Sequence, residues 1–289
     1  MQVTRTSLFQ STTLQIGLFE ARGVSDRCGD VERQDRNAVV LPLAGVFAKH
    51  DAPGRQVIGT PSHAVFVAAD TPYRISFPGG IGDRALILRF GEELAPEQVD
   101  ASGDDGLASN GLLPAPAMIL RNLLGARLGQ DDADEFEIET IGLDLLNVSF
   151  AAMRKDKPAA RPAAVTRRMR AMERVKEAIA IAPSRKWSVA RLAKHANLSP
   201  FHLCHLFRQI AGTSIYDYVL QERLAQALDA VLDGDDDLTA IALDAGFASH
   251  SHFTARFRGF FGCTPAALRR TATAARLAEL RKIVTARPH

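Results

Sequence analysis

Residues Leu238–Pro265 read LTAIALDAGFASHSHFTARFRGFFGCTP, and the rest of the chain makes sense as support for this stretch. Its apolar spacing predicts a short helix, a glycine turn at Gly246 and a second helix that Ser249 caps. A side-chain oxygen of Asp236 or Asp237 would cap the first of these helices. The buried positions of this stretch, which we call the second unit, would begin with Ile241, Ala242, Ala245 and Phe247.

The longer helix of the second unit has two different faces. Its packed face would comprise residues at three- and four-residue spacing, namely Phe253, Phe257 and Phe260 or Phe261. The opposite face comprises His250, Ser251, Thr254, Ala255 and Arg258. Short side chains that reach base edges, beside an arginine that reaches phosphate, suit the major groove of DNA. The alternative is an ordinary amphipathic helix with a solvated face.

A second copy of this pattern lies upstream. Trp187–Gly212, the first unit, reads WSVARLAKHANLSPFHLCHLFRQIAG and again predicts a short helix, a turn and a longer helix. Ser199 would cap the longer helix and Pro200 would occupy its first position. The two helices would pack through Val189, Leu192, Ala193, Leu203, Leu206, Phe207 and Ile210. The outward face of the longer helix comprises Phe201, Cys204, His205 and Arg208. A helical pattern over Ile215–Leu232 joins the two units.

These two units resemble the DNA-binding domain of the AraC/XylS family of transcription regulators. The resemblance covers roughly Arg168–Arg270 and rests on a glycine-phenylalanine turn, spaced phenylalanines and a Gly-x-Thr-Pro close, here Gly246, Phe247, Phe253, Phe257, Phe261, Gly262, Thr264 and Pro265. In that family two recognition helices enter successive major grooves of double-stranded promoter DNA. The resemblance therefore implies base reading by Phe201, Cys204, His205, His250, Ser251, Thr254 and Ala255. It also implies phosphate contacts by Arg208, Arg256 and Arg258.

Three positions depart from the family pattern. His205 and Ala255 stand where relatives often have arginine, and Leu268 stands where many have tyrosine. Arg256 follows Ala255, but one residue along a helix turns a side chain by about 100° and moves it off the reading face. We expect Arg256 to meet a phosphate or an internal carboxylate. The departures remove guanine-type bidentate contacts, so the recognised DNA sequence cannot be inferred from that of relatives.

Charge divides the chain of 289 residues, whose formal net charge is +2. Residues 1–153 hold 12 Lys and Arg against 21 Asp and Glu, whereas residues 154–289 hold 23 against 12. The net charges of the two parts are therefore −9 and +11. Because DNA is a polyanion, only the C-terminal part suits it, and the acidic N-terminal part should face away from DNA.

The N-terminal half has the pattern of an antiparallel β-barrel or sandwich. NAVVLPLAG (37–45), QVIGTPSHAVFVAADTPYRISF (56–77) and DRALILRF (83–90) read as strands separated by Gly and Pro turns. This half resembles, more weakly, the cupin-like sensing domains that often precede such DNA-binding domains, and barrels of this kind can hold a small molecule. Tyr73, Arg74 and Arg89 could orient an anionic effector or could simply be solvated, so the effector-binding residues stay unassigned. His50 and His63 are isolated, which does not favour a metal site.

Two apolar helical patterns follow the strands, over Ala117–Leu128 and Phe136–Met153, and they would cover the barrel or form a dimer interface. The predicted fold class is α+β, with an N-terminal antiparallel cupin-like barrel or sandwich, two helices and an all-α C-terminal domain. The predicted layout is an effector-binding and dimerisation domain at 1–153 (β-rich 1–110, helices 113–153), a linker at 154–165, an AraC-type DNA-binding domain at 166–271 and a helical tail at 272–289.

The predicted function is a ligand-responsive transcription regulator. The small-molecule effector is of unknown class, and a homodimer, RNA polymerase as a partner and activation as the sign of regulation follow the family resemblance.

No stretch of this sequence is long and apolar enough to span a membrane, and three scattered cysteines favour a reducing compartment, so we expect a cytoplasmic protein with no cofactor. No catalytic motif is present, although Cys204 could act as a redox sensor. The alternatives are a cupin-type enzyme with an accessory DNA-binding domain and a ligand-independent architectural DNA-binding protein.

Overall fold

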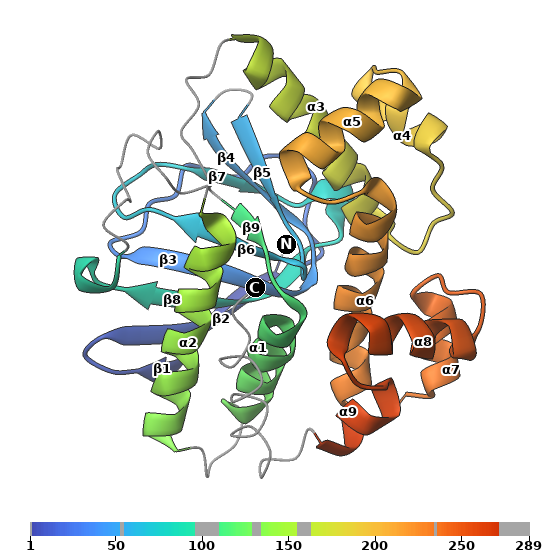
Figure 1. Cartoon of the computed structure of the whole chain (residues 1–289). Coiled ribbons are helices and arrows are strands. Elements are labelled where there is room, and N and C mark those ends of the chain that lie inside the picture. Colours follow the sequence, from blue (N-terminus) through green and yellow to red (C-terminus); the bar gives the residue numbers. More distant parts are fainter. Residues whose placement is uncertain are drawn as a thin grey trace.

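The computed structural model describes residues 2–52, 55–95, 110–128, 134–154, 163–233 and 236–271 (Figure 1). The strands are β1 (Gln2–Gln10), β2 (Leu14–Arg22), β3 (Asn37–Gly45), β4 (Phe47–Ala52), β5 (Arg55–Gly59), β6 (His63–Val67), β7 (Arg74–Ser76), β8 (Asp83–Phe90) and β9 (Asn110–Leu112). The α-helices are α1 (Ala115–Arg127), α2 (Glu135–Met153), α3 (Ala163–Ile181), α4 (Val189–Ala196), α5 (Pro200–Ala211), α6 (Ile215–Asp233), α7 (Leu238–Asp244), α8 (His250–Phe261) and α9 (Pro265–Thr271).

The N-terminal half is built from two antiparallel sheets. The larger has the order β1-β2-β8-β3-β6-β9 and the smaller the order β5-β4-β7. Strand β8 shows how the residues divide between the two layers, because successive side chains of a strand point to opposite faces. Ala85 and Ile87 belong to a core shared with Phe47 and Val57 of the smaller sheet. Leu86 and its even-numbered neighbours on β8 pack instead with α1 and α2. The predicted antiparallel β domain with two following helices is confirmed.

The strand predictions are correct for some strands and miss others, including the apolar strand β2. Strands β3 and β8 coincide with the predicted segments 37–45 and 83–90. Strands β1 and β2 were not predicted. β1 reads QVTRTSLFQ and is mostly exposed at the edge of its sheet, so it lacks the apolar alternation that would identify it.

Helices α1 and α2 cover the outer face of the larger sheet (Figure 1). Their apolar stripes are buried there, including Leu120 and Leu124 of α1 and Leu145 of α2. The Cβ that any other residue would place at Gly142 of α2 would lie 2.4 Å from a side-chain atom of Leu14 in β2, so the helix approaches the sheet closely at this point. The covering role that the sequence allowed for these helices is therefore the one observed.

The C-terminal half consists of helices α3 to α9 and contains both predicted units. The first unit is α4 and α5, and the second unit is α7 and α8. Helix α6 joins the units and lies between them and the N-terminal half (Figure 1). Among its buried residues are Tyr218, Val219, Leu224 and Ala225.

Capping residues that can be recognised in the sequence mark the start of several helices. The Ser199 and Ser249 side chains accept hydrogen bonds from the backbone N–H groups of His202 and His252, as predicted for N-caps. Asp237 occupies the cap position of α7, but its side chain forms no cap hydrogen bond, so that predicted mechanism is wrong. Val189 also differs from expectation, since 37% of its surface is exposed.

The predicted linker lies partly outside the described residues, and the predicted tail helix lies wholly outside them. Helix α3 begins at Ala163, inside the predicted linker at 154–165. Residues 155–162 of that linker and the predicted tail helix at 272–289 lie outside the described residues.

Helices α3 and α6 dock the C-terminal half on the sheets through buried polar contacts. Glu222 of α6 is fully buried, and its Oε1 accepts hydrogen bonds from the hydroxyl of Thr60 at 2.9 Å and from the hydroxyl of Ser62. Glu173 of α3 accepts from the backbone N–H of Ile58 at 3.1 Å. Burial raises the pKa of Glu222 and, together with Lys176, lowers that of neighbouring His63 well below its usual value. Because a buried polar group needs its partners, these contacts favour one docked arrangement.

Candidate nucleic-acid interface and sensing pocket

The outward face of α8 lies in solvent. His250, Ser251, Ala255 and Arg258 are exposed, and Thr254 is half-buried. The hydroxyl of Thr254 lies 3.4 Å from His250 Nε2, one helical turn away. Behind this face Phe253 and Phe257 are fully buried, and the Phe257 ring contacts that of Phe261 at 4.4 Å between centroids. The predicted division of α8 into a packed face and an open face is therefore observed.

The outward face of α5 is open as well. Phe201 is 85% exposed, and Cys204, His205 and Arg208 are exposed. Leu203, Leu206 and Phe207 on the other side are buried. A large aromatic ring in water at the first turn of a helix is unusual for a group that only fills space, because exposed apolar surface is unfavourable. Both units thus present a small surface of polar and basic groups, and the first unit adds an exposed aromatic ring.

An arginine-rich groove borders the first unit and was not part of the predicted site. It is formed by the start of α3 and by the turn between α4 and α5, and its lining includes Arg167, Arg168, Arg170, Arg174 and His202. Arg174 is engaged with the end of α4, where its guanidinium donates to the backbone carbonyls of His195 and Ala196. Arg167, Arg168 and Arg170 are exposed and form no ion pair with a described residue. The RRMR run at 167–170 was the sequence signal for this groove.

Arg256 lies off the reading face, as the helical rotation predicts. Its guanidinium lies over the ring of Tyr216 in α6, 5.9 Å from the centroid, and its Nε lies 3.4 Å from His252 Nε2. The predicted internal carboxylate partner is therefore wrong, since an aromatic ring takes that place. A cation over an aromatic face is a weak attraction that leaves the outer edge of the guanidinium open.

A single arginine links the two units. Arg223 of α6 donates to the carbonyls of Pro183 at 2.7 Å and Arg185 at 2.9 Å, just before the first unit, and to the carbonyl of Gly246 at 2.9 Å in the turn of the second. Because a guanidinium is planar and its N–H groups have fixed directions, these bonds restrict how the units can rotate against each other. The linking helix thus positions both outward faces.

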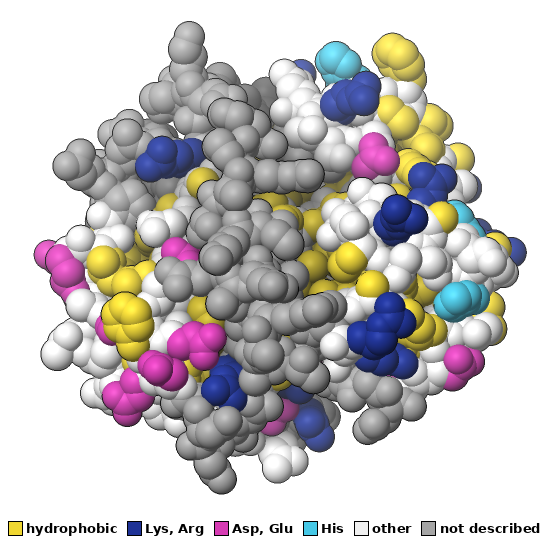
Figure 2. Space-filling model, turned by 60° about the horizontal axis from the view of Figure 1, so that its bottom comes forward, with side chains coloured by type: hydrophobic (Ala, Val, Ile, Leu, Met, Phe, Trp, Pro, Cys, Tyr) yellow, Lys and Arg dark blue, Asp and Glu magenta, His cyan; other side chains and the backbone are white. Residues whose placement is uncertain are grey.

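Surface charge follows the division of the chain. Figure 2 shows Lys and Arg side chains mostly over the helical half and Asp and Glu mostly over the sheet half. The net charges of the two parts, +11 for residues 154–289 and −9 for residues 1–153, agree with this view. A long-range field of this form attracts a polyanion to the side of the units and repels it from the sheets.

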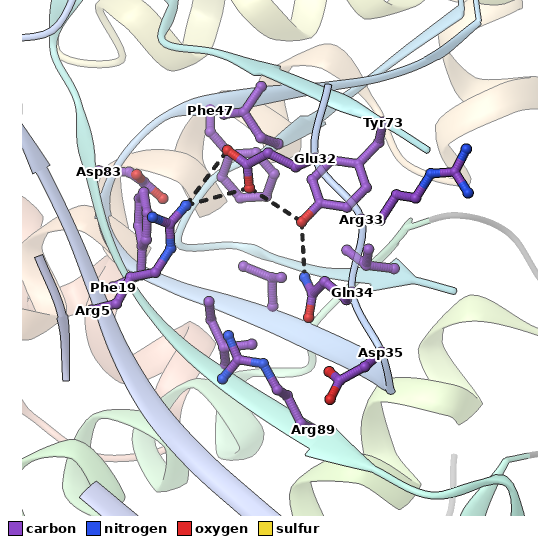
Figure 3. A pocket seen from close by; sticks show the side chains of 14 residues that line it. Arg5, Phe19, Glu32, Arg33, Gln34, Asp35, Phe47, Tyr73, Asp83 and Arg89 are labelled. Atoms are coloured by element: carbon purple, nitrogen blue, oxygen red, sulfur yellow. Dashed lines mark hydrogen bonds and ion pairs between the residues drawn. The ribbon is translucent and has the colours of Figure 1, made fainter. Parts of the chain in front are cut away.

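A cavity of about 530 Å³ lies between the two sheets, on the face of β8 that points away from α1 and α2 (Figure 3). Its apolar walls are formed by Phe19, Val40, Phe47, Val67, Ile75 and Ile87. Its size and its mixture of apolar walls with a few polar groups are typical of small-molecule sites. Tyr73 and Arg89, which the sequence offered as effector contacts, line this cavity, whereas Arg74 does not.

The polar groups of the cavity are only partly satisfied. Arg5 pairs with Glu32 at 3.3 Å, and the Gln34 amide donates to the Tyr73 hydroxyl at 3.0 Å. In contrast, Gln34 Oε1 and Asp83 Oδ1 are buried and have no hydrogen-bond partner among the described residues. Burial raises the pKa of Asp83 to about 7. Buried polar atoms are nearly always paired, so two orphaned acceptors in one cavity suggest a site for a hydrogen-bond donor.

His50, His63 and the three cysteines do not line the cavity. His50 Nε2 lies 2.9 Å from the Ser76 hydroxyl, and His63 is buried in the interface with α6. Within the described ranges no group of three His, Cys, Asp or Glu side chains is placed to hold a metal ion. Cys28 and Cys204 are exposed, Cys263 is half-buried, and all three are free thiols. No described helix has the length and apolar character needed to cross a membrane.

Comparison with known proteins identifies the helical half. A family model described as a helix-turn-helix domain matches residues 192–271. The probable transcription factor PqrA of Proteus vulgaris is 33% identical over 82 residues, which cover 28% of this chain and 67% of PqrA. The chain belongs to the AraC/XylS family of transcription regulators. The virulence regulon transcriptional activator VirF of Yersinia enterocolitica is 32% identical to this AraC/XylS member over 85 residues.

The alignments with these relatives cover less than a third of this AraC/XylS member. The alignment with VirF covers 29% of the chain and 31% of VirF. The chain thus spans less than a third of the length of the VirF relative that it matches. Among solved structures, ToxT from Vibrio cholerae O395 is similar with a TM-score of 0.36 and 10% identity, over 91% of this chain and all of that one. The N-terminal half is therefore interpreted from its own structure.

Proposed function

We propose that the chain is a ligand-responsive transcription regulator that reads double-stranded promoter DNA with α5 and α8. The observation that supports this most strongly is the repetition of one arrangement. Each unit has a serine-capped recognition helix with an aromatic or aliphatic packed face and an open face of small, polar and basic groups, to which the first unit adds Phe201. Two such helices on one rigid linking helix suit two successive major grooves on one side of the duplex.

The proposed contacts separate into base reading and phosphate binding. Bases would be read by Phe201, Cys204 and His205 in the first unit and by His250, Ser251, Thr254 and Ala255 in the second. Phosphates would be bound by Arg208, Arg256 and Arg258, to which the structure adds the exposed arginines of the groove beside the first unit, Arg167, Arg168 and Arg170. Phosphate contacts supply most of the affinity and fix the register, whereas base contacts supply the sequence preference.

The cavity between the sheets is the proposed effector site. Its lining includes β8, and Arg84 on the opposite face of that strand pairs with Asp229 of α6, which also accepts from Asn122 of α1. A ligand that changes the packing of β8 would thus bias the docking of α6 and the orientation of the units that α6 holds. This is a population shift between two arrangements, with the ligand favouring one of them.

The proposed organisation keeps residues 1–153 as the sensing and dimerisation domain, 154–165 as a linker and 166–271 as the DNA-binding domain, with a tail at 272–289. A homodimer through the N-terminal half, activation of transcription and contact with RNA polymerase are part of this proposal. A promoter target also implies a cytoplasmic location.

The test is retention of genomic DNA. Purified full-length protein is incubated with fragmented DNA of its own genome at near-physiological salt, and the retained fragments are sequenced. The proposal predicts discrete peaks upstream of a few operons. Uniform retention that depends on salt but not on sequence would contradict it and favour an architectural DNA-binding protein.

A further inference from the structure

Asp83 is the most unusual group in the cavity between the sheets. It is 7% exposed and lines the cavity, and its Oδ1 accepts no hydrogen bond from the described residues. A buried carboxyl group without a partner destabilises the fold, because its charged form is poorly solvated. A group that is unfavourable for folding and open to a cavity is well suited to bind a ligand that completes its hydrogen bonds.

Arg5, Arg33 and Arg89 line the cavity, and no ion pair joins any of them to Asp83 in the described part of the chain. Arg5 of β1 directs its guanidinium at Glu32 and lies over the Phe19 ring at 5.3 Å (Figure 3). Arg89 lies six residues from Asp83 on β8, about 20 Å along the strand. Burial lowers the pKa of Arg89, whereas the nearby Tyr73 and Asp35 raise it. Among the described residues, therefore, no cation forms an ion pair with Asp83.

We infer that the cavity binds a small organic amine, whose ammonium group pairs with Asp83 and whose apolar body packs between the sheets against Phe19 and Phe47. This inference rests on the proposed ligand-responsive function and names the chemical class of its effector. The ammonium supplies the missing donor, and Gln34 Oε1 offers a second orphaned acceptor on the same cavity. An apolar body fits because six apolar side chains from several strands form the walls.

The pH dependence of the affinity distinguishes an amine from a neutral ligand, because an ammonium group pairs with the ionised form of Asp83. The charged and titratable groups that line the cavity together with Asp83 are Arg5 of β1, Glu32, Arg33 and Asp35 of the segment before β3, Tyr73, and Arg89 near the other end of β8. Burial alone raises the pKa of Asp83 to about 7, so an amine that requires the ionised form must displace a proton below that pH. The affinity for an amine should be nearly constant above pH 7 and fall by up to about tenfold per pH unit below it. A neutral donor would show no such fall.

The experiment compares three matched probes on the full-length protein by isothermal titration calorimetry at pH 8, namely octylamine, 1-octanol and octanoate. We expect octylamine to bind at least tenfold more tightly than the alcohol. Asp83→Asn should abolish this preference. Asp35→Asn is the matched control, because Asp35 lines the same cavity but is exposed, and it should retain the preference.

The thermal midpoint of Asp83→Asn tests whether this variant folds. Because the raised pKa of Asp83 means that ionisation is unfavourable in the folded state, Asp83→Asn should raise the thermal midpoint at pH 8. That gain should shrink as the pH falls below about 7, where wild-type Asp83 takes up a proton. Equal midpoints at pH 8 would contradict the assignment of Asp83 as an unpaired buried carboxyl.

Three outcomes would overturn the amine assignment: tighter binding of 1-octanol or octanoate, an amine preference that survives in Asp83→Asn, or binding of none of the probes. Retention of genomic DNA by the same preparation separates this failure from failure of the proposed function. If discrete promoter fragments are retained while the amine fails, only the ligand class is wrong.

Discussion

The first unit packs on α3 around a core of its own, whereas the core of the second unit is continuous with that of the N-terminal half. Leu192, Leu203 and Phe207 of the first unit form one cluster with α3 and the start of α6. Phe253 and Phe257 of the second unit belong to the same cluster as α1 and the larger sheet. A change in the sheets therefore reaches the second unit through a continuous apolar core. It reaches the first through α3, by the hydrogen bond of Glu173 and by a small apolar cluster around Ala180.

The turns within the two units also differ in how closely they contact the rest of the chain. In the first unit the turn uses Asn197 in the left-handed conformation, with φ of 54°. In the second unit it uses Gly246, with φ of 79°, and a Cβ there would lie 2.5 Å from the carbonyl oxygen of Ser184. Ser184 belongs to the segment that precedes the first unit. The second unit is thus fixed against the first by a close backbone contact, and Arg223 reinforces that contact.

The largest expected effect is at Gly246. Gly246→Ala places a methyl group against backbone that cannot yield, in a conformation that Ala adopts reluctantly, so we expect a loss of about 3 kcal/mol or more in the free energy of unfolding. Gly212→Ala is the matched control, since Gly212 is also left-handed but a Cβ there would meet no atom within 4 Å. Its loss should be about 1 kcal/mol. Urea unfolding measures both, and equal losses would show that the contact with Ser184 does not fix the turn.

Arg223 tests whether the units are held as one body. Arg223→Ala removes the hydrogen bonds to Pro183, Arg185 and Gly246, and we expect a loss of about 2 kcal/mol in stability. Binding to a site with both half-sites should weaken more than binding to one half-site, since the units no longer share one orientation. Arg191→Ala, which removes one surface hydrogen bond to the Lys186 carbonyl, should leave the ratio of these affinities unchanged.

Next in size are the substitutions on the reading faces. His205→Ala and His250→Ala should each weaken binding to the preferred sequence by about 1–3 kcal/mol and relax the preference at particular bases. Arg258→Ala should weaken binding to all sequences alike. Selection of bound sequences from a randomised site measures the preference. Uniform losses in all three variants would mean that the faces are wrongly assigned.

The smallest effect is expected in the arginine-rich groove beside the first unit. Arg167→Ala or Arg170→Ala should leave the sequence preference unchanged and lower the slope of log affinity against log salt by about 1. Titrations with one DNA duplex between about 50 and 200 mM salt, concentrations at which phosphate contacts differ strongly, provide the measurement. An unchanged slope would remove these arginines from the proposed interface.

Features that depend on neighbouring residues in the sequence were predicted well. The serine caps at 199 and 249, the glycine turn at 246 and the separation of faces on α5 and α8 follow from spacing and side-chain chemistry within one or two turns. The roles of the exposed residues in DNA binding remain predictions.

Features that depend on distant partners were not predicted. Glu222 lies on a helix whose sequence suggests a solvated position, and the hydroxyls of Thr60 and Ser62, which are distant in the sequence, help to make its burial tolerable. The cavity collects residues from strands of both sheets and from a loop, so no single stretch reveals it. One signal was available on β8, where Asp83 and Arg89 share a face with the apolar Ala85 and Ile87. Charged residues at both ends of an inward face suggest a polar site within an apolar core.

The measurement that tests the central claim most directly is a footprint of the full-length protein on a retained promoter fragment, repeated with His205→Ala and with His250→Ala. Two reading units held on one linking helix should give two protected blocks about 10 base pairs apart on one side of the duplex. Each variant should weaken one block and leave the other in place. A single protected block, or equal weakening of both blocks by either variant, would contradict the assignment of two separate reading units.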